Sequence, residues 1–420
     1  MAHFKWFKVT VLSIVACGFV PFGVAQEENL FARDRYVSVT EREQPAYDPQ
    51  PIRLGVFDIR PELATGIGFT SNLFFEPSNG EGDGFVQIRP SVTGETTWSR
   101  NQLGFDVNLN FNEFFNNSSE TVTNFNTRGF GRLDIGSNTE ITAAIFGGIQ
   151  NEARSSSAAA AAAVEPISVV RYGAELAGQH QTGRLRLGAG VSATQSNFED
   201  VELLGGGELD QDFRDRLEIV ASGRAAWALQ RDLAVVGRVS YTDRNASSPT
   251  VLSPLDRDSN GVAVEVGANF ELPVLLRGEV TVGYQSFDFS ADEFGSIDGV
   301  AINGNVQWFP TQLTTVSAEV GREVIDPGLN ASAGAFRTGV RFGVDHELRR
   351  NILLRMRAGF ARADFEAIDR EDDLYTIGVG ALWKINRRVY LDSNYTYTDQ
   401  DSDIQPFSEN RLLFSLRLFL

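Results

Sequence analysis

The residues with the most evident chemistry in this sequence are arginines and glutamates that alternate with apolar residues along many segments. In an extended segment, successive side chains point to opposite sides, so these charges would share one face. Such a face could be the charged wall of a pore that sets ion or solute selectivity. It could also be a ladder of cross-strand ion pairs that fills and stiffens an interior, and the two can hold together. The residues on this polar phase are Arg184, Arg186, Arg216, Arg224, Arg238, Arg337, Arg341, Arg355, Arg357, Arg411 and Arg417, with Glu175, Glu218, Glu265, Glu279 and Glu319.

Catalytic and metal chemistry are not expected. Beyond the first 25 residues the only histidines are His180 and His346, and no nucleophile motif accompanies either. Hydrolysis would need a nucleophile, a base and an orienting group within reach of one another. Asp256, Asp258 and Asn260 resemble the start of a calcium loop, but no glutamate stands at its twelfth position. We therefore predict no catalytic residue, no metal site and no cofactor.

The elements that would position the charges are β-strands. The segment 103–111 shows the pattern, with Leu103, Phe105 and Val107 separated by polar Asp106 and Asn108. Alternation of this kind also occurs in a sandwich with one wet face, so by itself it does not decide the class. The same pattern recurs in segments 64–74, 85–99, 101–113, 121–136, 139–152, 168–181, 183–198, 212–229, 231–244, 259–272, 275–289, 294–309, 312–325, 336–347, 351–365, 373–385, 388–399 and 408–420.

The joins between these segments separate the two classes. Tight joins, such as those at Thr182 and Gln230, alternate with longer polar loops, such as 199–211 and 245–258. An even number of strands with short turns on one rim and long loops on the other is typical of outer-membrane barrels. We therefore predict an all-β, transmembrane, antiparallel up-and-down β-barrel of about 18 strands, with short periplasmic turns and longer extracellular loops.

The tryptophans support this interpretation independently. Trp98, Trp227, Trp308 and Trp383 each fall at the end of an even-numbered strand, just before a tight turn. In a closed barrel these positions share one height near the periplasmic rim. Tryptophan favours that depth because its ring is apolar while its N–H still reaches water. We predict that the four form a membrane-interface belt.

The start of the chain predicts export. Lys5 and Lys8 precede a short apolar run, and Ala25 ends a region of small residues, so residues 1–25 are expected to be a signal peptide cut before Gln26. A lipoprotein cut at Cys17 is the alternative. Residues 26–60 are a polar leader, expected to be disordered, although a periplasmic tether or a segment crossing the lumen remains open. Residues 61–420 form the barrel.

The partners follow from charge and from the last strand. Without Lys5 and Lys8 the chain holds 35 basic against 55 acidic residues, which argues against nucleic acid. Acidic loop residues such as Asp200 and Asp210 could bind divalent cations that bridge to lipopolysaccharide, though solvated charge is the simpler interpretation. The final alternating strand, which ends Phe419–Leu420, is expected to engage the barrel-assembly machinery. We expect outer-membrane lipid to surround the barrel, and the oligomeric state is left open.

A resemblance to a known family is carried by the segments 97–100 with 103–105, 212–216, 256–261, 308–311 with 313–316, 344–351, 368–373 and 386–387 with 389–391. Through these segments the sequence resembles the putative beta-barrel porin 2 family of outer-membrane proteins over most of residues 61–420. This resemblance implies an outer-membrane barrel in a Gram-negative bacterium, without a known substrate. We expect a porin-like channel for passive diffusion of small solutes or ions; the alternative is an accessory barrel of an exopolysaccharide or cell-envelope export system.

Overall fold

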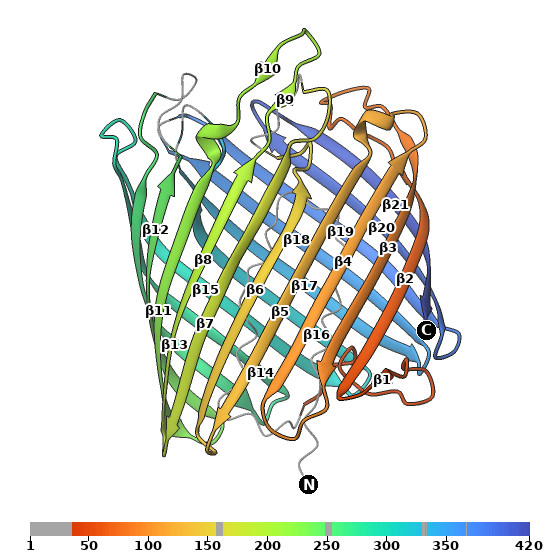
Figure 1. Ribbon diagram of the computed structural model, residues 1–420, viewed down its shortest axis with the longest axis vertical. Helices are drawn as coiled ribbons and strands as arrows, with labels where there is room; N and C mark the ends of the chain where they lie inside the picture. Colours follow the sequence, from red (N-terminus) through yellow and green to blue (C-terminus); the bar gives the residue numbers. More distant parts are fainter. Residues whose placement is uncertain (1–35, 157–162, 248–253, 330–331, 333, 367) are drawn as a thin grey trace.

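The structure is a computed structural model and describes residues 36–156, 163–247, 254–329, 332, 334–366 and 368–420. It is a closed antiparallel barrel of 18 long strands, each bonded to its neighbours in chain order (Figure 1). The barrel closes where the first long strand pairs with the last, from Glu62 opposite Phe419 to Thr70 opposite Arg411. Its strands are β2 (Phe57–Thr70), β3 (Asp83–Thr96), β4 (Gln102–Phe114), β5 (Val122–Ile135), β6 (Thr139–Asn151), β7 (Ser168–Thr182), β8 (Leu185–Phe198), β11 (Arg216–Gln230), β12 (Leu233–Ala246), β13 (Ser259–Leu272), β14 (Leu276–Phe289), β15 (Ser296–Thr311), β16 (Thr314–Ile325), β17 (Ala335–Arg349), β18 (Ile352–Phe365), β19 (Glu371–Lys384), β20 (Val389–Ser402) and β21 (Phe407–Phe419).

The predicted fold class is confirmed, and most strand ends fall within a few residues of their predicted places. Two starts were wrong. The first strand begins at Phe57 and not at residue 64, and the short β1 (Ile52–Leu54) pairs with its lower end. Pro61 lies where the pairing with β1 has ended and that with β21 has not begun, and a strand tolerates proline at such a point. Residues 212–214 form a 3-10 turn, η2 (Asp212–Arg214), and the strand begins only at Arg216.

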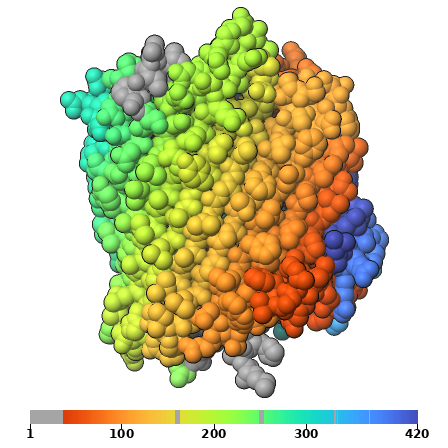
Figure 2. All heavy atoms as spheres, viewed as in Figure 1, coloured from red at the N-terminus to blue at the C-terminus, as the bar shows by residue number. Residues whose placement is uncertain are grey.

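The two faces of the wall differ as the alternation predicts. On β13, the apolar side chains of Val262, Val264 and Val266 are 45%, 55% and 57% exposed, while the intervening Glu265 is buried. Figure 2 shows this outer surface as a continuous wall over the N-terminal half of the barrel. Apolar groups therefore face outward, as lipid requires, and polar groups face the lumen. No helix in the described part of the chain is long and apolar enough to cross a membrane.

Residues 36–50, which we call the N-terminal segment, lie at the end of the barrel that carries the tight turns. The main-chain N–H of Val39 donates to Thr315 Oγ1 at 3.0 Å, and Arg277 donates to the carbonyl oxygen of Tyr36 at 2.9 Å. Further contacts join Arg42 to Glu347, Lys384 to Asp48, and the Tyr390 hydroxyl to the carbonyl oxygen of Tyr47.

The N-terminal segment thus touches strands from β14 to β20 around the rim. The expectation that the leader is disordered is wrong for these residues, because five different strands supply fixed partners for them. Residues 1–35, with the predicted signal peptide and Cys17, lie outside the described residues.

Candidate pore lining

Ion pairs between strands that are not neighbours show which face is concave. Glu279 on β14 accepts from Arg224 on β11 at 2.5 Å and from Arg238 on β12 at 3.1 Å. Neighbouring strands are about 4.8 Å apart, so β11 and β14 are about 14 Å apart along the wall. Side chains can bridge that span only on the inside, where they converge. The polar phase therefore faces the lumen.

Most of the predicted polar residues lie on strands and have partners there. Arg337 bonds to Glu323, Arg341 lies 3.6 Å from Glu319, and Arg357 bonds to Asp345. Elsewhere Glu218 accepts from Arg244, Glu175 accepts from Arg128, Glu265 accepts from Thr281 and Asn303, Arg186 donates to Gln181, and Arg411 lies 4.0 Å from Glu409. The cross-strand ladder described from the sequence is thus present on this face.

Arg184 departs from the pattern. It lies with Gly183 in the tight turn between β7 and β8, where its side chain is exposed. Gly183 has a φ of +56°, a left-handed conformation that ends the strand before Arg184 can join its polar phase. The sequence pattern predicts a turn at Thr182 alone and a strand from residue 183, so the prediction that Arg184 lies on the polar face of a strand is wrong.

A network of ion pairs spans the closing seam of the barrel, and within it Arg417 lies 3.8 Å from Asp392. Arg417 on β21 donates to both carboxylate oxygens of Glu62 on β2, at 2.7 and 3.0 Å. Asp392 accepts from Arg355 at 2.5 Å, and both side chains are less than a tenth exposed. A bidentate arginine–carboxylate contact is strong and directional, so it helps to fix the register of the two strands that close the barrel.

Two pairs at mid-height are instead well exposed although they face inward. Arg128 and Glu175 are 47% and 41% exposed, and Arg341 and Glu319 are 30% and 47% exposed. The first pair lies on β5 and β7, and the second lies on β16 and β17, half-way around the barrel. Water can therefore reach both opposite walls at this level.

At the loop end, contacts join parts of the wall that are several strands apart. Arg216 at the start of β11 donates to Asp326, which follows β16, at 2.8 Å. Arg257, in the loop before β13, donates to the same carboxylate at 3.0 Å and to the carbonyl oxygens of Leu329 and Ser332. Burial acts to raise the pKa of Asp326, but the two guanidinium groups and the Gly328 N–H outweigh it and hold that pKa below its usual range.

These loop-end residues were mostly missed from the sequence. Arg244 shares the phase of Arg238 and could have been included on that signal alone. Arg257 and Asp326 lie in loops, where no periodicity marks them, and only the folding of two loops toward each other brings them together.

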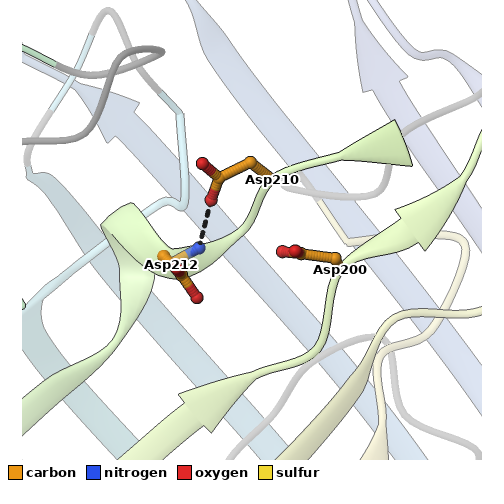
Figure 3. A group of neighbouring side chains, drawn as sticks. All are labelled: Asp200, Asp210 and Asp212. Atoms are coloured by element: carbon orange, nitrogen blue, oxygen red, sulfur yellow. Dashed lines mark hydrogen bonds between the residues drawn. The ribbon is translucent and has the colours of Figure 1, made fainter. Parts of the chain in front are cut away.

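Three carboxylates of the loop between β8 and β11 come together near the short hairpin of β9 (Val201–Glu202) and β10 (Glu208–Leu209). Oxygens of Asp200, Asp210 and Asp212 lie within 4.8 Å of one another (Figure 3). Asp200 accepts the main-chain N–H of Gln211, and Asp210 accepts that of Asp212. Two of the three carboxylates thus already serve to shape the loop.

The tryptophans and histidines lie at the tight-turn end. Trp98, Trp227, Trp308 and Trp383 are between 47% and 51% exposed, three at strand ends and Trp98 in a turn. Each of the two histidines has a threonine hydroxyl near its Nδ1: His180 pairs with Thr139, and His346 pairs with Thr314. These two contacts do not supply the nucleophile and the orienting group that hydrolysis requires.

Several solved structures are similar to this chain. OccK2 (OpdF) of Pseudomonas aeruginosa is 11% identical, with a TM-score of 0.46 over 86% of this chain and 98% of that chain. OccK1 (OpdK) of the same organism is 10% identical, with a TM-score of 0.46 over 86% and 99%. A mutant of its ferric enterobactin receptor PfeA is 8% identical, with a TM-score of 0.48 over 86% and 80%. No curated protein matches the chain.

The family profile described as "Putative beta-barrel porin 2" matches residues 44–419, which is nearly all of the described chain. It includes the N-terminal segment from Gln44 onward as well as every long strand. The chain is therefore a porin-like barrel of the outer membrane and belongs to the putative beta-barrel porin 2 family.

Proposed function

We propose that this protein is a passive channel for small solutes or ions. The observation that carries the proposal is the pair of exposed, inward-facing ion pairs, Arg128–Glu175 and Arg341–Glu319, on opposite walls at mid-height. A barrel of 16–18 strands is wide enough to leave an aqueous channel when nothing fills it. Side chains that are 30–47% exposed inside such a wall are what a water-filled lumen would produce.

The two ends set the proposed size limit. At the tight-turn end the N-terminal segment lies on the rim, and at the loop end the Arg216–Asp326 contact joins strands that are five places apart. These contacts would make both mouths narrower than the middle. This arrangement favours small solutes over polymers.

The test is planar-bilayer recording of the purified full-length chain. We expect discrete conductance steps of porin size that are ohmic at low voltage. A barrel that inserts and yet stays silent at all voltages would contradict the proposal. Transport of a polysaccharide would be indicated if deletion removed surface polysaccharide while solute uptake stayed normal.

The remaining expectations on placement belong to the same proposal. Signal cleavage after Ala25 would leave Gln26 as the first residue of the outer-membrane protein, which N-terminal sequencing of the purified chain can check. Recognition of β21 by the assembly machinery predicts that removal of the strand from Phe414 onward abolishes insertion. The acidic loop residues would face the lipopolysaccharide layer.

A further inference from the structure

Arg171 is unusual among the inward-facing arginines. Its Nε donates to Ser196 Oγ at 3.2 Å, and it forms no ion pair with any residue that the structure describes. Most other inward-facing arginines, such as Arg128 and Arg224, have a carboxylate within 4.0 Å. The two terminal nitrogens of Arg171 therefore hold hydrogen-bonding capacity that the described wall does not use.

A second arginine lies in the same row of the sheet. Ser196 on β8 is opposite Arg171 on β7 and opposite Arg216 on β11, so the two arginines flank one serine. Their Cα atoms are separated by two strand spacings, about 10 Å. Arg216 is 22% exposed and Arg171 is half-buried, so both can be reached from the lumen.

The surroundings of this row hold both signs of charge. Arg214, Arg244 and Arg257 form ion pairs with Glu152, Glu218 and Asp326. Asp215 accepts the main-chain N–H of Phe198 and has Asp200 and Asp212 near it. The neighbouring arginines are thus already paired with acids, whereas Arg171 and Arg216 place two like charges in one row, and an anion between them would reduce their repulsion.

The space behind the row is too small for a solute. A cavity of about 10 Å³ is lined by Arg214, Arg216, Arg244, Arg257 and Asp326. This volume holds about one water molecule. A ligand must therefore approach from the lumen, where it meets Arg171 and Arg216. Asp326 already makes with Arg216 the contact that a solute carboxylate would make with Arg171.

We infer that Arg171, Ser196 and Arg216 form a binding site for the carboxylate of a small organic anion near the loop end of the lumen. The inference rests on the proposed channel function and names the class of solute that the channel would favour. Guanidinium groups suit this role because their planar N–H donors match the two oxygens of a carboxylate.

The test uses the purified full-length chain, gluconate as the anion and sorbitol as a matched neutral molecule. Binding is measured by isothermal titration calorimetry in detergent, which does not require an open channel, and block is measured by single-channel recording. We expect saturable gluconate binding and block, with no effect of sorbitol. Arg171→Gln should weaken gluconate binding about tenfold, since a hydrogen bond to a charged group is lost.

The control is Arg341→Gln, which removes one positive charge from the opposite wall. It should leave gluconate affinity within about twofold of wild type. Arg341 lies on the wall opposite Arg171, and its distance from the site exceeds the Debye length of about 10 Å. Equal weakening by both variants would overturn the site, as it would show only bulk lumen charge. Absence of saturable binding with conductance intact would also overturn it. Absence of conductance with gluconate binding intact would contradict the channel and leave the site standing.

Discussion

The middle and the ends of this barrel use the same residue types in opposite ways. At mid-height, Arg128 and Glu175 are 47% and 41% exposed, and they lie on a wall with water in front of it. At the loop end, Arg257 and Asp326 are 5% and 11% exposed, and they join two loops of the rim. An arginine–carboxylate pair can thus line the wall or hold loops together, and the difference is burial.

The energetic consequence follows from solvation. An exposed pair contributes little to stability, because water competes for both charges and salt screens them. Removing one partner of a buried pair is costly, because the remaining charge is buried without a compensating partner. Changes at the ends should therefore alter structure and pore size, whereas changes in the middle should alter selectivity.

Asp326→Asn should have the largest effect. It leaves Arg216 and Arg257 without their shared carboxylate, which costs about 3 kcal/mol in the docking of the residues after β16. We expect single-channel conductance to rise and the Gly328 N–H, which Asp326 accepts, to lose hydrogen-exchange protection. Asp369→Asn, at an exposed loop carboxylate, is the control and should change neither. If both variants conduct like wild type, the contact does not narrow the lumen.

Glu347→Gln tests the tight-turn end of the barrel. Its effect on conductance and on hydrogen exchange should be smaller than that of Asp326→Asn. Glu347 is 8% exposed but its partner Arg42 is 32% exposed, so water partly compensates the lost pair and the cost is about 1 kcal/mol. We expect faster exchange of the Val39 N–H, which is bonded to Thr315, and a modest rise in conductance. Arg349→Gln, on the same rim and exposed, serves as the control. Unchanged exchange in Glu347→Gln would mean that other contacts hold the segment.

Arg128→Gln and Glu175→Gln test the middle. Each should change the free energy of unfolding by less than about 1 kcal/mol, because the pair is exposed. In a salt gradient, the reversal potential should shift toward cation preference for Arg128→Gln and toward anion preference for Glu175→Gln. The double variant should return close to wild type. A loss of stability comparable to that of Asp326→Asn would remove the distinction between middle and ends.

Lowering the pH into the mildly acidic range should have the smallest effect on conductance. The pKa of Asp326 lies below its usual value, so its contribution is complete at neutral pH and is lost only when pH falls through the lowered pKa. Conductance of the wild-type channel should therefore stay level as pH falls from neutral to about 4, the ordinary range of an aspartate. A rise in conductance between pH 7 and 5 would show that Asp326 titrates there and that the contact is weaker than its geometry implies.

Much of the inner wall could be predicted from the sequence, since alternation alone assigned Glu279, Arg341 and Glu319 to the polar face. The partners could not. Arg224 pairs with a residue on a strand three places away, and Glu265 accepts from Thr281 on the next strand and from Asn303 on the strand after it. Alternation identifies the face of each residue, but barrel curvature and side-chain length select its partner.

Local patterning by itself determined the class, the strand number and the two faces of the wall, because the two-residue period of a strand is a property of the backbone. Only the tertiary structure decided which residues contact one another at the two ends of the barrel. The N-terminal segment has no periodicity, yet Thr315, Glu347 and Arg277 fix it in place. Arg257 and Asp326 are 69 residues apart in the chain and meet only because two loops of the rim fold toward each other. Contacts of this kind depend on distances that exist only once the barrel has closed.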